Sequence, residues 1–195
     1  MTESSWYKMT EGRDLAQGDI VPGCQVIVPQ SSAAVGETVP AVMERRNVIV
    51  VSQSCDLAHG KCETVSVCRV VPLERFVDVS VDAQRHRDRS AGRELAADRY
   101  EEKKFEQKEQ LRKGFVFNCH LLDKCSIGAA NADFQVVDFR TLLGIPFANL
   151  QDFVGGLGER PRLTSPYREH LSQAIARFFM RVGLPSDIPP FRRPT

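Results

Sequence analysis

An α+β fold with one main domain is what this sequence predicts, and three observations carry the prediction. The chain has 195 residues and 42% hydrophobic content, which is enough to bury one good-sized core. Its first 80 residues contain short β-branched runs between turn-forming residues. A charge-dense stretch and an amphipathic segment follow further along the chain, and both have helical character.

Strands account for most of the first 80 residues. Val48 to Val51 is a continuous β-branched run, which is typical of a strand buried on both faces. Thr64 to Val71 is a second long run, and it stops at Pro72. Two shorter strands, Asp19–Val21 and Gln25–Val28, precede them, and residues 31–40 predict a small polar loop.

The stretch from residue 82 to residue 113 is dominated by Glu, Lys, Arg, Gln and Ala, and it predicts a long helix. Its apolar residues are too sparse for a wide buried stripe, so we expect a mostly solvated arm that projects from the strands. Two interpretations of its basic start stay open: a solvated face with paired opposite charges, or a nucleic-acid-binding surface that grips phosphates. The arginines of that surface are Arg85, Arg87, Arg89 and Arg93.

Strand character returns after the charged stretch. Phe115–Cys119 and Phe134–Phe139 are rich in aromatic and β-branched residues and predict two strands. Residues 128–133 have the composition of a turn, so we expect the two strands to pair as a hairpin. Phe147–Val154 has the pattern of a short helix.

The clearest helix runs from Pro166 to about Val182. Thr164 or Ser165 can cap it, and the proline fits its first turn. Its apolar residues recur at spacings of three and four, which predicts a helix docked on a core. They are Tyr167, Leu171, Ala174, Ile175, Phe178 and Val182. A proline-rich tail follows, as far as Thr195.

The overall charge excludes a strongly basic nucleic-acid binder of the usual kind. The formal net charge is +1, so any contact with nucleic acid depends on a local patch. No apolar run is long enough to cross a bilayer, and the start Met1–Trp6 lacks the features of a signal peptide. We therefore expect a cytoplasmic protein that does not insert into a membrane.

Ser52 to Asp56 form the most reactive-looking segment, and their polar side chains have no evident packing role. A buried strand ends here, and strand ends hold functional side chains in positions that stay open to ligands. Cys55 is the best single candidate for a site, with Asp56 beside it. A nucleophilic cysteine needs a histidine or cation nearby to lower its pKa, and His59 is a local candidate. Metal binding and simple packing of a thiol are the alternatives.

Zinc is the cofactor that the cysteines and histidines suggest. Structural zinc takes four thiolate or imidazole ligands in a tetrahedron, and two loops commonly share them. One segment would supply Cys55, His59 and Cys62, and a second would supply Cys119, His120 and Cys125. Reduced thiols without a metal are the alternative, because disulfides are rare in the cytoplasm.

Three short motifs carry a family resemblance: Gly18-Asp19-Ile20, the strand from Arg46 to Ser52, and the apolar segment Val70-Val71-Pro72-Leu73. On these motifs the first 80 residues resemble the PemK/MazF family of small barrels from bacterial toxin–antitoxin systems. The resemblance implies a small β-barrel, formed by residues 1–81 with 114–160. Residues 82–113 would then be a charged helical insertion, and residues 161–195 a docked C-terminal helix and tail.

Members of that family are ribonucleases that cut single-stranded RNA with an arginine and a threonine. The resemblance implies that Arg46 is the arginine. Glu74 stands where the threonine is expected, and Asn47 replaces the proline that follows the arginine. A glutamate can serve as a base but repels phosphate, so a barrel that cuts RNA and a barrel that only binds both stay open.

The function that we expect is a binding module of a prokaryotic toxin–antitoxin or phage-defence type system. Its partner would be a protein or RNA. One alternative is a divergent endoribonuclease that uses Arg46 and Glu74. The other is a cysteine-dependent enzyme centred on Cys55.

Overall fold

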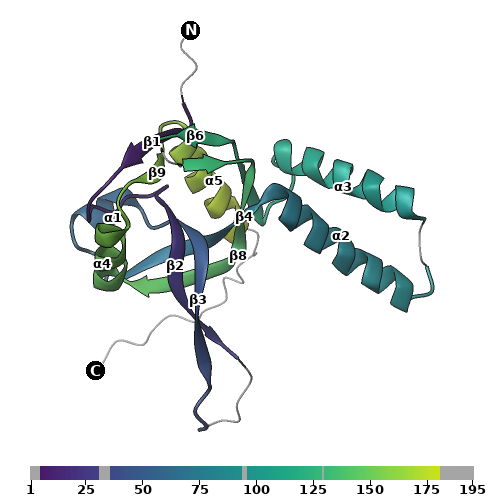
Figure 1. The fold of residues 1–195 in the computed structure, drawn as a ribbon, viewed down its shortest axis with the longest axis horizontal. Helices are drawn as coiled ribbons and strands as arrows, with labels where there is room; N and C mark the ends of the chain where they lie inside the picture. Colours follow the sequence, from purple (N-terminus) through teal and green to yellow (C-terminus); the bar gives the residue numbers. More distant parts are fainter. Residues whose placement is uncertain (1–4, 31–35, 94–95, 129, 181–195) are drawn as a thin grey trace, which may run out of the picture.

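The computed structural model describes residues 5–30, 36–93, 96–128 and 130–180, which form an α+β fold and so confirm the predicted fold class (Figure 1). The strands are β1 (Tyr7–Thr10), β2 (Ile20–Pro29), β3 (Ala41–Val50), β4 (Thr64–Pro72), β5 (Cys119–Leu122), β6 (Cys125–Ile127), β7 (Ala130–Ala132), β8 (Gln135–Pro146) and β9 (Arg160–Leu163). The helices are α1 (Ser54–Ala58), α2 (Leu73–Ser90), α3 (Ala97–Arg112), α4 (Phe147–Leu157) and α5 (Tyr167–Phe179).

A five-stranded antiparallel sheet in the order β2-β3-β4-β8-β5 is the centre of the molecule. The end of β3 shows how side-chain alternation builds it. Val48 and Val50 pack in the cluster on one face of the sheet, and Ile49 and Val51 pack in the cluster on the other. All four are buried, so the prediction of a strand buried on both faces is confirmed.

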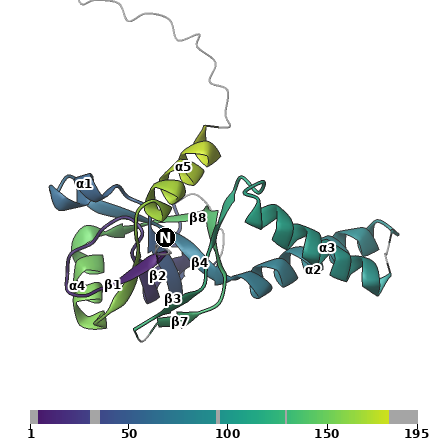
Figure 2. The ribbon, with the colours of Figure 1, turned by 90° about the horizontal axis from the view of Figure 1, so that it is seen from above.

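Each face of the sheet is covered by a different helix. On one face α5 contributes Leu171 and Ala174 to a cluster that contains Phe139 of β8. On the other face α4 contributes Leu150 and Val154 to a second cluster. Figure 2 shows α5 lying across the strands and well separated from α4. The C-terminal helix is therefore docked, as its apolar stripe predicts.

The sheet is bent by two irregularities in strand pairing. The register between β2 and β3 shifts between Val21 and Cys24, and that between β4 and β8 shifts at Val67 to Arg69. Such bulges add local twist and bend the strands. Gly23 lies in the first of them with a φ of 60°, which only glycine adopts readily. The bent sheet does not close into a barrel within the described residues.

The charged stretch differs from the single helix that we predicted over residues 82–113. It folds as a hairpin of two helices, and the first of them, α2, begins nearer the N-terminus, at Leu73. Gly92 follows α2 with a φ of 68°, so it helps to end that helix. The hairpin projects from the sheet, as Figure 1 shows, and its base packs through Leu73, Val77 and Leu111.

The predicted hairpin of Phe115–Cys119 with Phe134–Phe139 is only partly correct. The second strand continues to Pro146, and the first begins at Cys119 rather than at Phe115. The two strands do pair, through Cys119 to Leu122, but β6 and β7 form a small hairpin between them. The predicted end of the last helix at Val182 and the proline-rich tail lie outside the described residues.

A buried ion pair joins the small β1–β9 sheet to the central sheet. Asp19 and Arg160 are fully buried, and Arg160 Nε donates to Asp19 Oδ2 over 3.1 Å. Arg162 also donates to both carboxylate oxygens of Asp19. Arg160 Nη1 donates to the backbone oxygen of Gly12, and Arg160 Nη2 donates to that of Asp14. Buried charges are tolerated when they are paired and hydrogen-bonded in this way.

None of the helices in the described part of the chain has the length and apolarity that crossing a membrane requires.

Candidate nucleic-acid interface

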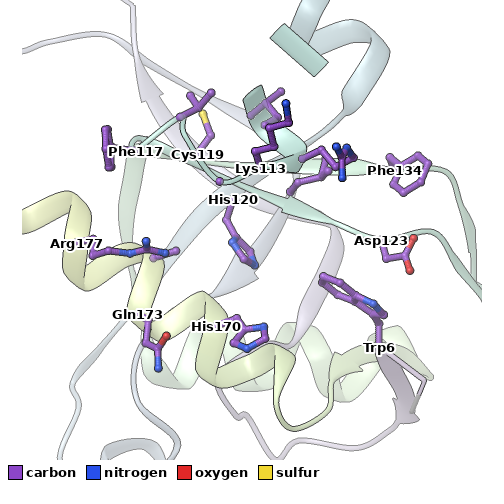
Figure 3. Close-up of a pocket in the computed structure, with 16 residues that line it drawn as sticks. Trp6, Lys113, Phe117, Cys119, His120, Asp123, Phe134, His170, Gln173 and Arg177 are labelled. Carbon is purple, nitrogen blue, oxygen red and sulfur yellow. The ribbon is translucent and has the colours of Figure 1, made fainter. Parts of the chain in front are cut away.

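A cavity of about 410 Å³ opens between β5, the end of α3 and α5 (Figure 3). We call it the α5–β5 pocket. Its size is in the usual range for a small-molecule or nucleotide site. The side chains that bear on its chemistry are Trp6, Lys113, Phe117, His120, Phe134, His170, Gln173 and Arg177.

One face of α5 forms a wall of the pocket. His170, Gln173 and Arg177 are spaced by three and four residues, which places them on the same side of a helix. The apolar residues Leu171 and Ala174 lie next to this stripe and hold the helix on the sheet. The stripe is therefore fixed in position by the packing of the same helix.

Strand β5 and the segment before β1 form the facing walls. His120 belongs to β5, and Figure 3 shows it and His170 entering the cavity from opposite walls. Trp6 is held by stacking on Tyr167 of α5, with ring centroids 4.0 Å apart and planes 13° from parallel. Segments from both ends of the described chain thus meet at this one cavity.

The pocket is electropositive. Lys113 and Arg177 make no ion pair with a described residue, whereas Arg112 is paired with Glu109. Asp123 is the one acidic residue among the lining residues that the structure describes. Two cations that form no ion pair with a described residue favour an anionic ligand, because a bound anion would offset their mutual repulsion.

His120 is a strongly perturbed ionisable group of the pocket. Burial, together with smaller contributions from the nearby His170 and Arg177, lowers its pKa to about 4. The ring is therefore neutral at pH 7. Its Nε2 atom is buried and has no hydrogen-bond partner among the described residues. A buried polar atom without a partner is uncommon in native proteins.

Aromatic rings continue the pocket outward along the segment after α3. Phe117 is 52% exposed and Phe115 is 66% exposed. Phe134 lies on the other side, with Lys124 Nζ 5.0 Å from its ring centroid. Cations interleaved with exposed aromatic rings are typical of surfaces that bind single-stranded nucleic acid.

The segment Ser52 to Asp56, which sequence reasoning favoured as the site, lies on and before the short helix α1. Its two serines have structural roles that we did not expect. Ser52 Oγ accepts a hydrogen bond from the Ser66 backbone over 2.8 Å, and Ser54 Oγ accepts one from the Gln17 backbone over 3.1 Å. These bonds tie the loop to neighbouring segments. The polar character of the segment is thus partly explained without a ligand.

Cys55 itself is exposed, and its neighbours do not form a thiol-activating group. Its Sγ lies 3.7 Å from Gln53 Oε1 and 3.8 Å from Asp56 Oδ1. His59 Nδ1 contacts the backbone oxygen of Cys55 over 2.6 Å instead of its thiol. Cys55 and Asp56 lie on α1 and His59 follows its last residue, but the His59 ring contacts a backbone oxygen rather than the thiol.

The zinc ligands predicted from the sequence are not gathered at one point. Cys62, Cys119 and Cys125 belong to three different hydrophobic clusters. Burial raises the pKa of Cys119 to about 12, with the Asp138 charge adding to the shift, so its thiol is protonated at pH 7. No three His, Cys, Asp or Glu residues of the described ranges are grouped so as to hold a metal ion. Zinc stays a prediction.

Arg46 and Glu74, the residues suggested by the family resemblance, lie on different elements. Arg46 of β3 forms an ion pair with Glu44, at 2.9 Å from Nε and 2.7 Å from Nη2. Glu74 of α2 accepts a hydrogen bond from Lys108 of α3 over 2.6 Å. Each side chain has its own partner, so the two are not arranged as one acid–base pair.

The four arginines predicted to bind nucleic acid lie on or just after the distal half of α2. Arg85 packs over the ring of Tyr100 at 5.2 Å, and Arg87 donates to Gln84 over 2.9 Å. Arg85 and Arg89 line a shallow hollow together with Asp82 and His86. The described residues that line this hollow come from one helix and include no Phe, Tyr or Trp, in contrast to those of the α5–β5 pocket.

Sequence reasoning named only His120 among the polar residues of this pocket, and it did so as a zinc ligand. Lys113, His170 and Arg177 were missed because the walls come from segments far apart in the chain. A partial signal was present: a polar stripe runs beside the apolar stripe on the helix that we predicted to dock.

Comparison with known proteins adds no relatives, since no family model, curated protein or solved structure matches this chain. The relation to the PemK/MazF family therefore stays a prediction.

Proposed function

We propose that this protein binds single-stranded nucleic acid, and RNA in particular, in the α5–β5 pocket. The observation that carries the proposal is the convergence of Lys113 and Arg177 with Trp6, Phe117 and Phe134 at one cavity. The cations would contact phosphates, and the rings would stack on bases. Stacking on a ring stabilises the complex by about 1–3 kcal/mol per base and is tolerant of base identity.

A nucleic-acid site in this pocket is compatible with the nearly neutral net charge of the protein. Its net charge of +1 supplies little long-range attraction, so affinity depends on the local cations of the pocket. A role as a binding module in a prokaryotic toxin–antitoxin or phage-defence type system, acting in the cytoplasm, fits the motifs that resemble the PemK/MazF family. The bent sheet would be the counterpart of that family's barrel.

Anisotropy titration of a fluorescent oligouridine of about twelve nucleotides tests the proposal. Arg177→Ala and Lys113→Ala should each weaken binding about tenfold, because each removes a phosphate contact worth roughly 1 kcal/mol or more. Each should also reduce the slope of log K against log salt by about 0.7, the value expected for one phosphate on a single strand. A free mononucleotide should bind more weakly than the oligomer, since it offers one base and one phosphate.

The matched control is Arg87→Ala, which removes a cation from the competing basic surface on α2. It should change the affinity by less than about twofold, within the range of a distant surface charge. Loss of binding in Arg87→Ala with normal binding in Arg177→Ala would move the site to α2 and overturn the proposal.

A further inference from the structure

Attraction between the pocket cations and a phosphate gives no role to the neutral ring of His120. Its ring borders the cavity, as Figure 3 shows, yet Nε2 is buried without a hydrogen-bond partner among the described residues. Leaving a buried polar atom unpaired costs free energy, which a ligand group that pairs with it would recover. This makes Nε2 a place where a ligand is recognised through a specific hydrogen bond.

The ligand group has to suit a neutral imidazole. One ring nitrogen of a neutral imidazole donates a hydrogen bond and the other accepts one, and the tautomer decides which is which. A hydroxyl group both donates and accepts, so it pairs with Nε2 in either tautomer. A phosphate oxygen only accepts, and the cations Arg177 and Lys113 hold it more strongly than an imidazole does.

We propose that His120 hydrogen-bonds to a ribose 2′-hydroxyl and so makes the pocket select RNA over DNA. The inference rests on the proposed binding of single-stranded nucleic acid at this cavity. The 2′-hydroxyl is the group by which a protein distinguishes the two polymers at a given position. With a deoxyribose in the pocket, Nε2 would again be left without a partner, and that penalty is the source of the discrimination.

The test compares an oligouridine with the deoxyuridine oligomer of the same length and dye, by anisotropy at one salt concentration. The wild-type protein should bind the ribose form about tenfold or more tightly, as expected when a buried polar group loses its partner. His120→Phe keeps a ring of similar size but cannot form the hydrogen bond, so its two affinities should become equal. Arg87→Ala, which removes a cation from α2 outside the pocket, should leave the ratio of affinities unchanged.

A measurement on the wild-type protein covers the case in which His120→Phe does not fold. The imidazole ¹⁵N signals of His120 should shift on titration with the ribose oligomer and much less with the deoxyribose oligomer. Equal wild-type affinities for the two oligomers, or an RNA preference that persists in His120→Phe, would overturn the role of His120 while leaving nucleic-acid binding intact. Binding of neither oligomer would overturn the proposed function as well.

Discussion

Asp19 is a motif residue whose role the sequence did not reveal. Gly18-Asp19-Ile20 is one of the motifs that carry the family resemblance. In the structure, the buried carboxylate of Asp19 lies between two arginines of β9. Arg160 and Arg162 lie more than a hundred residues away, so spacing in the sequence could not predict this pairing. The glycine is constrained as well, because a Cβ at Gly18 would lie 2.9 Å from Leu163 Cβ.

We expect Asp19→Ala to destabilise the fold by about 3–5 kcal/mol, because removal of one partner leaves buried positive charge uncompensated. Urea denaturation monitored by circular dichroism measures the loss. Asp152→Ala provides the control, since it removes an exposed ion pair with Arg13 and should cost less than about 1 kcal/mol. Similar costs for the two variants would show that the Asp19 pair is not the buried link described above.

His120 should make stability fall in acid. Its pKa of about 4 in the folded protein lies below the value of 6.5 expected in the unfolded chain. Between these values the unfolded chain binds more protons, so the free energy of unfolding decreases as pH drops from 6.5 to 4. The difference corresponds to roughly 3 kcal/mol. His170 and Arg177 face the ring from α5, and Lys113 and Asp123 also line the pocket.

Urea denaturation at several pH values, with His120→Gln as the reference, checks this dependence. The variant should lose less stability than the wild type between pH 6.5 and pH 4, because glutamine does not titrate. Parallel curves for the two proteins would mean that His120 is solvated and titrates normally.

At the scale of elements, the sequence predicted the two long buried runs and the last helix, whereas the two short strands expected at Asp19–Val21 and Gln25–Val28 are one strand, β2. Val48 to Val51 and Thr64 to Val71 are strands because their β-branched residues fill both faces of the sheet. The prediction of one helix over the charged stretch was wrong, since helix propensity is high throughout and the end of α2 depends on the backbone freedom of Gly92. The two helices there share one hydrophobic cluster, to which α2 contributes Val77 and Val81 and α3 contributes Tyr100.

Helix α5 should be anchored mainly by Leu171, which is fully buried in the main cluster. Leu171→Ala is expected to cost about 2–5 kcal/mol, the range for a large-to-small change in a packed core. Phe178 is only partly buried, so Phe178→Ala should cost less than the 3–5 kcal/mol or so of a fully buried ring. Denaturant melts of both variants measure these losses.

The control for α5 is Phe179→Ala, which truncates a ring that is 55% exposed on the same helix. Its effect should be below about 1 kcal/mol, as for most surface substitutions. A cost for Leu171→Ala no greater than that for Phe179→Ala would contradict the docking of α5 on the sheet.

At the scale of the whole molecule, the candidate site could not be read from the sequence. The residue types and the strand-end position in one segment of the chain favoured Cys55 as the site. The α5–β5 pocket instead combines Trp6, Lys113, His120 and Arg177, which only the fold brings together. The residues next to each of them in the sequence form no recognisable motif, so neither composition nor spacing identifies the four as one site.

Photo-crosslinking tests the central claim, nucleic-acid binding in the α5–β5 pocket, most directly. The protein would be irradiated with an oligonucleotide that carries 4-thiouridine, and the linked peptides would be identified by mass spectrometry. We predict crosslinks at Trp6, Phe117 or Phe134, with lower yield in Arg177→Ala. Crosslinks confined to α2 around Arg85, or to α1 around Cys55, with none in the pocket, would contradict the account.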